Sequence, residues 1–340
     1  ARGITTPEAA AEFLERERKL TISPMLMRDM DKAVERIQRA IADGETVAVF
    51  GDYDVDGVTA TALLYTYLDS AGADVYYKLP SRDDDGYGLS ETAVDLMAAK
   101  GVSLIVTVDN GVSANAAIAH AKEQGVDVVV TDHHLPPQTL PEAAAIVNPQ
   151  LPSDESPCKT LSGAGVAFKL AAALDGCTPD EMLPFYGDLA AIGTIADIML
   201  LEGENRRIVK AGLALLQQTE RPGIAALIEA CGLGGKELTA ENVSFGLAPR
   251  LNAAGRMDSA AAALELLLCE DPEEAEAIVA GLEAQNAARQ KAEQDILQGV
   301  LDSVAADETY GADRILVVWG RGYHQGVIGI VCSRLCDRYG

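Results

Sequence analysis

The chain has 340 residues, 48% of them hydrophobic, and carries a formal net charge of −25 at pH 7. A chain of this size and hydrophobicity can bury one large core or two. Its acidity argues against a broadly basic nucleic-acid-binding surface, because phosphates are normally met by lysine and arginine, but it leaves room for a narrow site where metal ions and a few arginines supply positive charge.

The sequence has no feature of an exported or membrane protein. It lacks a run of about 18 apolar residues, the length that a membrane span requires, and its first residues, ARGITTPEAA, are charged and polar rather than a signal peptide. The six cysteines are scattered without a C-x-x-C pair, which favours reduced thiols over a disulfide framework or a zinc site. We therefore expect a cytosolic protein that makes no membrane contact.

Along the chain, residues 1–45 are predicted to be helical, since apolar residues recur at helix spacing and the pattern ends at Gly44. Short β-rich runs then alternate with helical segments that end at glycine. The predicted strands are 46–50, 74–79, 103–108, 127–131 and 144–147, and the helical segments are 57–72, 89–101 and 113–125. Nearly continuous apolar strands separated by helices predict an α/β fold with a parallel, Rossmann-like sheet covered on both faces.

After residue 150 the chain is predicted to be mostly helical. Residues 275–304 form a long, charge-rich helical segment that is able to bridge two lobes. RILVVW, residues 314–319, then predicts a fresh strand that opens a second α/β unit. Because a lone strand followed by one helix cannot bury its faces, we expect the chain to be a fragment of a longer protein.

The stretch GDYDVDG, residues 51–57, has the alternating aspartates of a calcium loop, Asp52, Asp54 and Asp56. Two observations exclude a calcium loop. Position 12 of such a loop should be a bidentate glutamate and is Leu63 here, and an EF-hand loop follows a helix, whereas this stretch follows a predicted strand. The aspartates therefore need another explanation.

Acidic and imidazole side chains also follow two other predicted strands. Asp109 comes directly after 103–108, and Asp132, His133 and His134 come directly after 127–131. Ligands bind outside the carboxyl ends of the strands in an open parallel sheet, so all these side chains are expected at one edge. So many carboxylates would repel one another, and carboxylates beside imidazole suit Mn²⁺ or a similar divalent ion. Helix capping explains one aspartate but not two adjacent histidines.

Six motifs carry a family resemblance: FGDYDVDG, VTVDNG, VVVTDHH, LAAIGTIADI, APRLNAAGRM and GRGYHQGVIGIVCSRL. In this order they resemble the DHH-family phosphoesterases and, within them, the RecJ-type single-strand-specific exonucleases. The resemblance implies two Mn²⁺ or Mg²⁺ ions in a cleft between two domains. It also implies two-metal hydrolysis of single-stranded DNA from 5′ to 3′, which releases nucleoside 5′-monophosphates in DNA repair and recombination. The implied partners are single-stranded DNA, a single-strand-binding protein and a helicase.

The same resemblance divides the chain into parts. The expected parts are an N-terminal helical segment (1–45), a DHH phosphoesterase domain (46–274), a connecting helix (275–308) and an incomplete DHHA1-like domain (309–340). RecJ-type enzymes continue with the rest of the second domain and an oligonucleotide-binding barrel, neither of which is in these residues.

Metal ligands follow from the first three motifs by resemblance. Asp54 and Asp56 correspond to ligands of the first motif, and Asp52 stands at the head of that motif. Asp109 corresponds to a carboxylate that bridges the two ions, and His133 to an imidazole ligand.

Further site residues are implied by the third and fourth motifs. Asp197 in GTIADI corresponds to the last acidic ligand, and Asp188 is the rival for that place. His134 is expected to face the scissile phosphate, and Asp132 to hold a histidine in place. With Asp109, these two are the expected catalytic residues. A purely structural alternative makes Asp132 a buried aspartate that only supports a histidine.

The last two motifs are expected to grip the substrate phosphate. The implied residues are Arg250, Asn252 and Arg256, followed by His324, Gly326, Ser333 and Arg334. Arginine binds phosphate bidentately, and backbone N–H groups at a helix start hold an anion. Arg250 has the structural alternative of capping a helix end. His120, outside these motifs, is expected to be a surface residue.

Other functions stay possible within the family. A short-oligonucleotide phosphodiesterase usually carries a GGGH-like loop, where this chain reads GRGYHQG. A manganese pyrophosphatase places a histidine where this chain has Phe50. A non-catalytic replication scaffold of the same fold usually lacks metal-binding residues, all of which are present here.

Overall fold

The computed structural model describes residues 4–14, 22–80, 88–306 and 315–339. Its centre is a parallel sheet of five strands in the order β2-β1-β3-β4-β5. The strands are β1 (Thr46–Phe50), β2 (Asp74–Lys78), β3 (Val102–Val108), β4 (Asp127–Thr131) and β5 (Ala145–Val147). All five strands predicted from the sequence are confirmed to within one residue at each end, and so is the α/β fold class.

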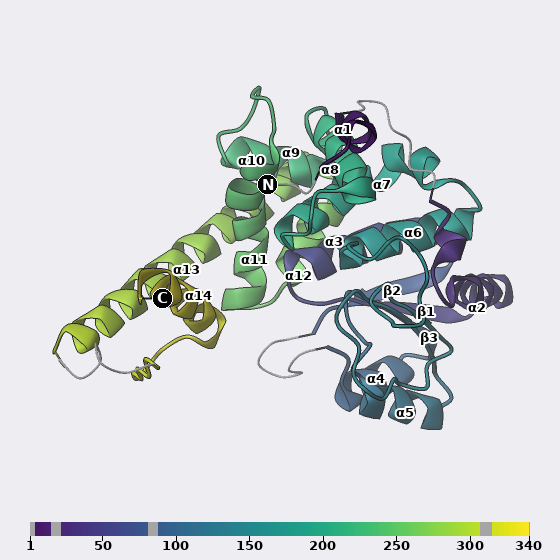
Figure 1. Ribbon diagram of the computed structural model, residues 1–340. Coiled ribbons are helices and arrows are strands. Elements are labelled where there is room, and N and C mark those ends of the chain that lie inside the picture. The colour runs from purple at the N-terminus through teal and green to yellow at the C-terminus, as the bar shows by residue number, and fades with distance from the viewer. Residues whose placement is uncertain (1–3, 15–21, 81–87, 307–314, 340) are drawn as a thin grey trace.

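Helices cover both faces of the sheet, as Figure 1 shows. Helices α4 (Glu91–Ala98) and α5 (Asn115–Glu123) lie on one face, and α2 (Met30–Asp43), α3 (Val55–Ser70) and α6 (Gly163–Asp175) lie on the other. Successive side chains of a strand point to opposite faces, so Val47 and Val49 pack with the second group while Ala48 and Phe50 pack with the first. This double burial explains why the strands read as continuous apolar runs.

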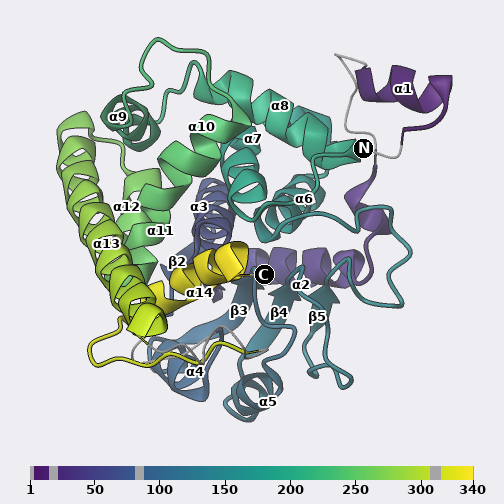
Figure 2. The ribbon, with the colours of Figure 1, turned by 60° about the vertical axis from the view of Figure 1, so that its left-hand side comes forward.

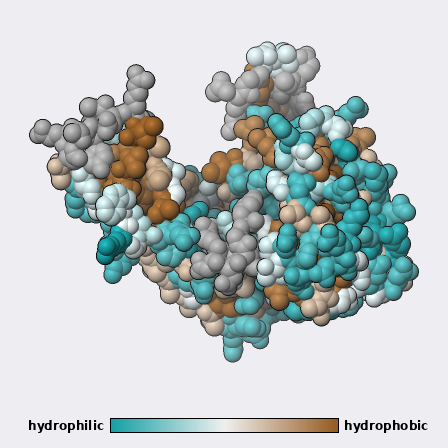
Figure 3. Space-filling view, turned by 90° about the horizontal axis from the view of Figure 1, so that it is seen from below, coloured by the Kyte–Doolittle hydropathy of each residue, from teal (hydrophilic) through white to brown (hydrophobic). Residues whose placement is uncertain are grey.

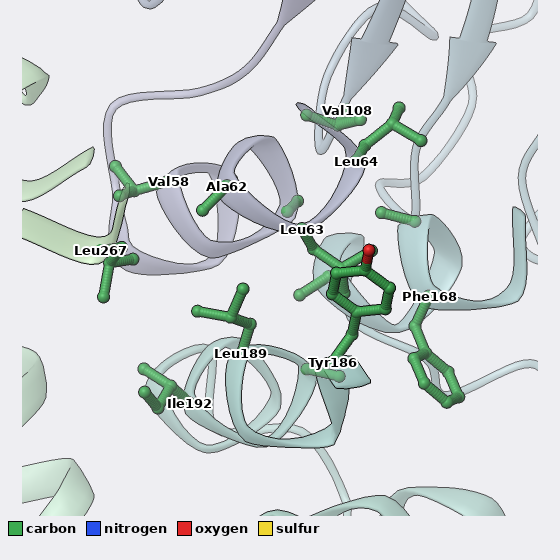
Figure 4. Close-up of a cluster of buried hydrophobic side chains, with 14 of the residues drawn as sticks. Val58, Ala62, Leu63, Leu64, Val108, Phe168, Tyr186, Leu189, Ile192 and Leu267 are labelled. Atoms are coloured by element: carbon green, nitrogen blue, oxygen red, sulfur yellow. The ribbon is translucent and has the colours of Figure 1, made fainter. Parts of the chain in front are cut away.

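A second layer of helices packs on α3 and α6. It contains α7 (Pro179–Ala196), α8 (Gly203–Leu216), α9 (Pro222–Ala230) and α12 (Ala261–Leu268). Figure 4 shows Leu63 of α3, Phe168 of α6 and Leu189 of α7 in the core between these layers. The helix α7 is thereby fixed over the sheet, and its last residue lies next to the edge at which the strands end.

Short elements complete the helical part. They are α1 (Pro7–Leu14), a 3-10 turn (Pro24–Leu26), α10 (Ala240–Asn242), a π-helical turn (Val243–Leu247) and α11 (Ala248–Met257). The expected N-terminal helical segment is present as α1 and α2, and part of it, residues 15–21, lies outside the described residues. No helix in the described part of the chain combines the length and apolar character that crossing a membrane requires.

The C-terminal part forms an arm, defined here as residues 286–306 and 315–339. It consists of the distal part of the long helix α13 (Pro272–Ala306) and of α14 (Gln325–Tyr339), which enclose a small cluster of Ile296, Val300, Val327 and Val331. Figure 2 shows α13 along the outer side of the molecule, and Figure 3 shows a hollow between the arm and the larger body.

The strand predicted over 314–319 is wrong for the residues that can be described. Residues 315–319 belong to no strand, and Ile315, Val317 and Trp319 are 74%, 68% and 83% exposed. Apolar residues form a strand only where they pair with a neighbouring strand, and residues 315–319 join no strand pairing in the described part of the chain. Hydrophobic side chains consequently gather on the surface of the arm (Figure 3).

Candidate active site

Three neighbouring strands end at the same level of the sheet. Phe50 of β1 pairs with Thr107 of β3, and Val108 of β3 pairs with Thr131 of β4. The chain runs outward in opposite directions from β1 and β3, so the point between these two strands is a topological switch point. The polar residues that follow β1, β3 and β4 therefore meet at one crevice.

The loop after β1 is held by hydrogen bonds to its own aspartates. Asp54 caps α3 and accepts from the backbone N–H of Gly57 at 3.0 Å. Both carboxylate oxygens of Asp56 accept from the start of α6, Oδ2 from Gly163 N at 2.6 Å and Oδ1 from Ala164 N at 2.9 Å. Asp54 therefore does cap a helix, as one explanation of the aspartates required. It still lies at the same edge of the sheet as the other carboxylates.

Asp109 occupies the centre of the crevice in an unusual environment. Its backbone lies in the left-handed region with φ of 62°, which costs energy in a residue other than glycine but is tolerated by aspartate. The residue is 1% exposed, and its Oδ1 accepts no hydrogen bond from the described residues, although Nε2 of His133 lies 3.0 Å away. A buried carboxylate oxygen that accepts no hydrogen bond is unfavourable unless a cation neutralises it.

His133 joins three carboxylates. Its Nε2 lies 3.0 Å from Oδ1 of Asp109, 3.6 Å from Oδ2 of Asp197 and 3.7 Å from Oδ2 of Asp56. Burial, followed by the charge of His134, lowers the pKa of His133 to about 4. The imidazole is therefore neutral at physiological pH, and neutral imidazole is the form that binds metal ions.

Asp132 holds His134 and the loop that carries both histidines. Its Oδ1 accepts from the backbone N–H of His133 and His134 and lies 2.8 Å from Nδ1 of His134. Its Oδ2 accepts from Val112 N at 2.9 Å. The hydrogen bond to Asp132 raises the pKa of His134 to about 9, so this histidine is protonated. Although burial opposes ionisation of Asp132, these hydrogen bonds lower its pKa overall. The predicted supporting role of Asp132 therefore has a geometric basis.

The remaining carboxylates repel one another. Burial, followed by the charge of Asp54, raises the pKa of Asp52 to about 7. The same two causes raise the pKa of Asp197 to about 6 and that of Asp56 above its ordinary value. Burial and the charge of Asp56 raise the pKa of Asp109 as well. The raised pKa values mean that these carboxyl groups bind protons unless a cation offsets their negative charge.

Three groups of side chains have ligand atoms within 4.8 Å of one another. They are Asp109, His133 and His134; Asp56, His133 and Asp197; and Asp52, Asp54 and Asp109. Asp109 and His133 each belong to two of the groups, and of the two only the carboxylate of Asp109 has two oxygens with which to reach two ions, as the predicted bridging position requires. Oxygen ligands with one neutral imidazole suit Mn²⁺, so the residues present fit a pair of divalent ions.

The two candidates for the last acidic ligand lie in different places. Asp197 ends α7 beside His133. Asp188, nine residues earlier, accepts from Nε of Arg221 at 2.8 Å and belongs to none of the three ligand groups. The geometry favours Asp197.

The α11 motif contacts the site at close range, and the phosphate binding predicted for its residues remains a prediction. The Oδ1 of Asn252 accepts from Val55 N at 3.2 Å and so holds the start of α3. Arg250 donates to Glu283 of α13 and to the carbonyl oxygen of Gly246. A Cβ on Gly255 would lie 2.3 Å from the carbonyl oxygen of Tyr53, so α11 touches the first aspartate loop directly.

Arg256 and the start of α14 are joined. Nη1 of Arg256 donates to the carbonyl oxygen of Gly326 at 3.0 Å, and a Cβ on Gly326 would lie 2.2 Å from the carbonyl oxygen of Arg256. Nδ1 of His324 accepts from Gly326 N at 3.1 Å and thereby caps α14. Since α11 also touches the aspartate loop, the start of α14 is one helix away from that loop.

Ser333 and Arg334 lie further along α14 and are exposed. The hydroxyl of Ser333 donates to the carbonyl oxygen of Gly329. Arg334 pairs with Glu293 of α13, at 2.5 Å between Nη2 and Oε1. Neither residue makes a contact with the three ligand groups in the described structure, so their predicted phosphate binding remains a prediction.

The sequence reasoning missed three supporting residues. A Cβ on Gly163 would lie 2.5 Å from Oδ1 of Asp109, and one on Gly193 would lie 2.4 Å from Oδ1 of Asp56. Glu293 is 2% exposed and pairs with both Arg289 and Arg334. No local pattern marks the two glycines, because each contacts a residue that is distant in sequence, and the pairing of Glu293 with Arg334 joins two different helices. His120 pairs with Asp95, away from the site, as expected for a surface residue.

A hollow of about 430 Å³ adjoins the site. Its wall includes Asp132, His134 and the residues that start α4 and α5. The hollow therefore borders the site on the side where the protonated His134 lies.

Comparisons with known proteins agree with this geometry. Residues 46–194 match the model of the DHH family, N-terminal domain. The chain is 43% identical over 339 residues to the single-stranded-DNA-specific exonuclease RecJ of Bacillus subtilis, a match that covers 99% of this chain and 42% of that protein. The chain thus spans less than half the length of this relative.

Solved structures give the same result. A crystal structure of exonuclease RecJ bound to manganese is similar with a TM-score of 0.83 and 39% identity, over 92% of this chain and 78% of that one. RecJ of Thermus thermophilus in complex with Mn²⁺ is similar with a TM-score of 0.82 and 37% identity, over 96% of this chain and 46% of that one. The same protein has also been solved with Mg²⁺.

Proposed function

This chain belongs to the DHH family and is similar to RecJ proteins in both sequence and fold. We therefore propose that it is a metal-dependent exonuclease of single-stranded DNA. In this proposal it works from the 5′ end, releases nucleoside 5′-monophosphates and serves DNA repair and recombination. The observation that carries the proposal is the buried Oδ1 of Asp109, which accepts no hydrogen bond and is surrounded by carboxylates and a neutral imidazole.

The proposed metal ligands are Asp52, Asp54, Asp56, Asp109, His133 and Asp197. Two divalent ions, Mn²⁺ or Mg²⁺ as in the related RecJ structures, would lower the pKa of a water and offset charge on the phosphate oxygens. The chain prepares their site by holding Asp56 with two backbone N–H groups and by keeping His133 neutral.

His134 has a different task in the proposed reaction. It is half exposed, protonated and oriented through Nδ1 by Asp132, so its Nε2 is the nitrogen that can donate to a phosphate oxygen. A fixed cationic donor stabilises the charge that develops on that oxygen. Asp132 acts through His134 and is a positioning residue.

We propose that only a few cationic residues close to the carboxylates bind the phosphates of the DNA strand. Arg256 and the start of α14 lie one helix from the aspartate loop, and Arg334 is exposed on the same helix. A few such cations fit a chain with a net charge of −25 better than an extended basic surface does. We further propose that the protein works in the cytosol beside a single-strand-binding protein and a helicase, which supply the single strands.

The test uses single strands of DNA labelled at either end, incubated with the protein in Mn²⁺ or in EDTA. Label released first from the 5′ end, and only with Mn²⁺, is the expected result. Release confined to oligomers of two to five nucleotides would favour a short-oligonucleotide phosphodiesterase. Intact strands under all conditions would overturn the proposal and favour a scaffold.

A further inference from the structure

The end of α7 has a strained residue directly after Asp197. The backbone N–H of Ile198 donates to the carbonyl oxygen of Ile195 at 3.1 Å, and that of Met199 donates to Thr194 at 3.2 Å. This pair of hydrogen bonds defines a Schellman motif, in which the residue at the position of Ile198 is left-handed and usually glycine. Ile198 has φ of 56°, and a β-branched residue in this conformation is an outlier.

Packing within the described residues does not explain the isoleucine. Its side chain is 86% exposed, the highest value among the exposed large hydrophobic side chains of the described chain. A strained residue persists when its surroundings demand it, and strained residues cluster at functional sites. The surroundings that could use this side chain therefore lie outside the described residues.

A second exposed hydrophobic side chain adjoins the same site. Leu135 directly follows His134 and is 80% exposed. Since Asp197 lies 3.6 Å from His133, both hydrophobic side chains are within two residues of side chains that meet at the crevice. One exposed leucine is ordinary, but here two flank a cluster of charged groups, and one of them is held at the cost of strain.

We propose that Ile198 and Leu135 form an apolar rim that packs against the base and sugar of the nucleotide whose phosphate lies at the carboxylates. This inference rests on the proposed function. If the phosphate is held at the ligand groups, the substrate atoms within reach of adjacent residues are those of the sugar and the base. Contact with the apolar face of a base is independent of sequence, which suits an enzyme that degrades any single strand.

The substitution Ile198→Gly separates this role from a structural one. Glycine is the preferred residue at this position of the motif, so the variant should unfold at the same or a higher temperature than the wild type. If the rim holds substrate, the same variant should bind nucleotides more weakly. A gain in stability with a loss of affinity is not expected of a residue that only supports the fold.

The experiment measures binding to the Mn²⁺-loaded protein of two probes, thymidine 5′-monophosphate and 2-deoxyribose 5-phosphate, by calorimetric titration. The wild type should bind the probe with a base more tightly, by roughly fivefold, less than a fully enclosed apolar contact gives. Ile198→Gly and Leu135→Ser should reduce that difference. Phe185→Ser, at another exposed position of α7 that is 65% exposed in the wild type, should leave it unchanged.

The outcomes distinguish the two proposals. Equal ratios of the two affinities in the wild type and Ile198→Gly would overturn the apolar rim, whatever the nuclease assay shows. A base-dependent difference that the rim variants abolish would support it even if the wild type left single strands intact, a result that overturns only the proposed exonuclease. A lower unfolding temperature for Ile198→Gly would contradict the strain on which the inference depends.

Discussion

The carboxyl edge of the sheet and the arm differ in how their charged side chains are held. At the sheet edge, Asp56 accepts two backbone N–H groups and Asp132 accepts three, and both residues are 1% exposed. In the arm, Arg334 is 55% exposed in its side chain and is held by one carboxylate, Glu293.

The cores behind the two regions differ as well. The sheet edge rests on strands covered on both faces, whereas the arm encloses a cluster of four buried residues. Groups that carry out chemistry need a fixed geometry, and groups that grip a moving strand need less. We therefore expect substitutions at the edge to affect turnover and metal binding, and substitutions in the arm to affect substrate affinity.

The largest effect should come from Asp109→Asn, which keeps the shape of the side chain and tolerates the left-handed backbone. Turnover of single-stranded DNA should fall by more than about 100-fold, the upper range for residues that only support a ligand. Without metal, the variant should unfold at the same or a higher temperature, because the raised pKa of Asp109 shows that its charged form is disfavoured there and the amide is neutral. Initial rates and thermal unfolding in EDTA measure both effects.

Asp188→Asn is the matched control for that substitution. It removes the pairing with Arg221, so stability should decrease while turnover stays near that of the wild type. If Asp188→Asn abolished turnover and Asp109→Asn did not, the assignment of the ligand groups would be wrong.

A smaller effect is expected for Asp132→Asn. The amide replaces one of two accepting oxygens and can no longer stabilise a protonated His134, so the pKa of His134 should fall toward its ordinary value. Turnover of single-stranded DNA should fall by roughly 10- to 100-fold, because Asp132 positions His134. Initial rates measure the turnover, and NMR of the histidine ring measures its pKa. An unchanged turnover and an unchanged pKa of His134 would reduce Asp132 to a purely structural residue.

In the arm, Glu293→Gln should raise KM for single-stranded DNA by about 3- to 10-fold, the equivalent of one hydrogen bond that positions Arg334. The turnover number should change little, because Glu293 is far from the ligand groups in the chain and pairs only with arginines. Glu276→Gln, at an exposed position of the same helix, is the control. A fall in kcat at constant KM would break the contrast between the two regions.

The smallest effect should be a pH dependence confined to the sheet edge. With folded pKa values of about 7 for Asp52 and about 9 for His134, the metal-free folded state holds protons that the unfolded chain has released. Its stability should therefore fall as pH rises from about 6 to about 8. Mn²⁺ replaces those protons, so the stabilisation by Mn²⁺ should increase over the same range.

Thermal unfolding with and without Mn²⁺ at several pH values measures this effect, which should amount to a few degrees. Glu293→Gln should show the same pH dependence as the wild type. A metal-free protein that became more stable from about pH 6 to about pH 8 would refute the protonated state of the cluster.

Much of the fold and the centre of the site are readable from the sequence. The strands are continuous apolar runs, and parallel strands place the residues that follow them at one edge. The proximity of Asp109 and His133 could therefore be predicted from the sequence alone. The strand predicted at 314–319 is absent from residues 315–319, because a short apolar run becomes a strand only when it pairs with a neighbouring strand. Pattern alone does not report that neighbour.

Long-range contacts explain the rest of what the sequence could not indicate. The pairing of Arg250 with Glu283, thirty-three residues later, is visible in no local pattern. Asn252 serves the first turn of α3, and Gly163 leaves room for Asp109, through contacts between segments far apart in the chain. The domain boundaries predicted from the resemblance remain predictions, although α13 begins at Pro272, close to the expected boundary.

Because the register between β1, β3 and β4 is fixed, the number of residues in each strand determines where the site residues that follow it lie. Along β3, Val106 and Val108 face one layer of helices and Ile105 the other, so one inserted residue would turn Asp109 to the opposite side. Exchanges among valine, isoleucine and leucine within the strand preserve the position of Asp109, whereas an insertion or deletion does not. Sequence drift in the interior of β3 is thus compatible with an intact catalytic centre as long as the residue count between Val102 and Asp109 stays the same.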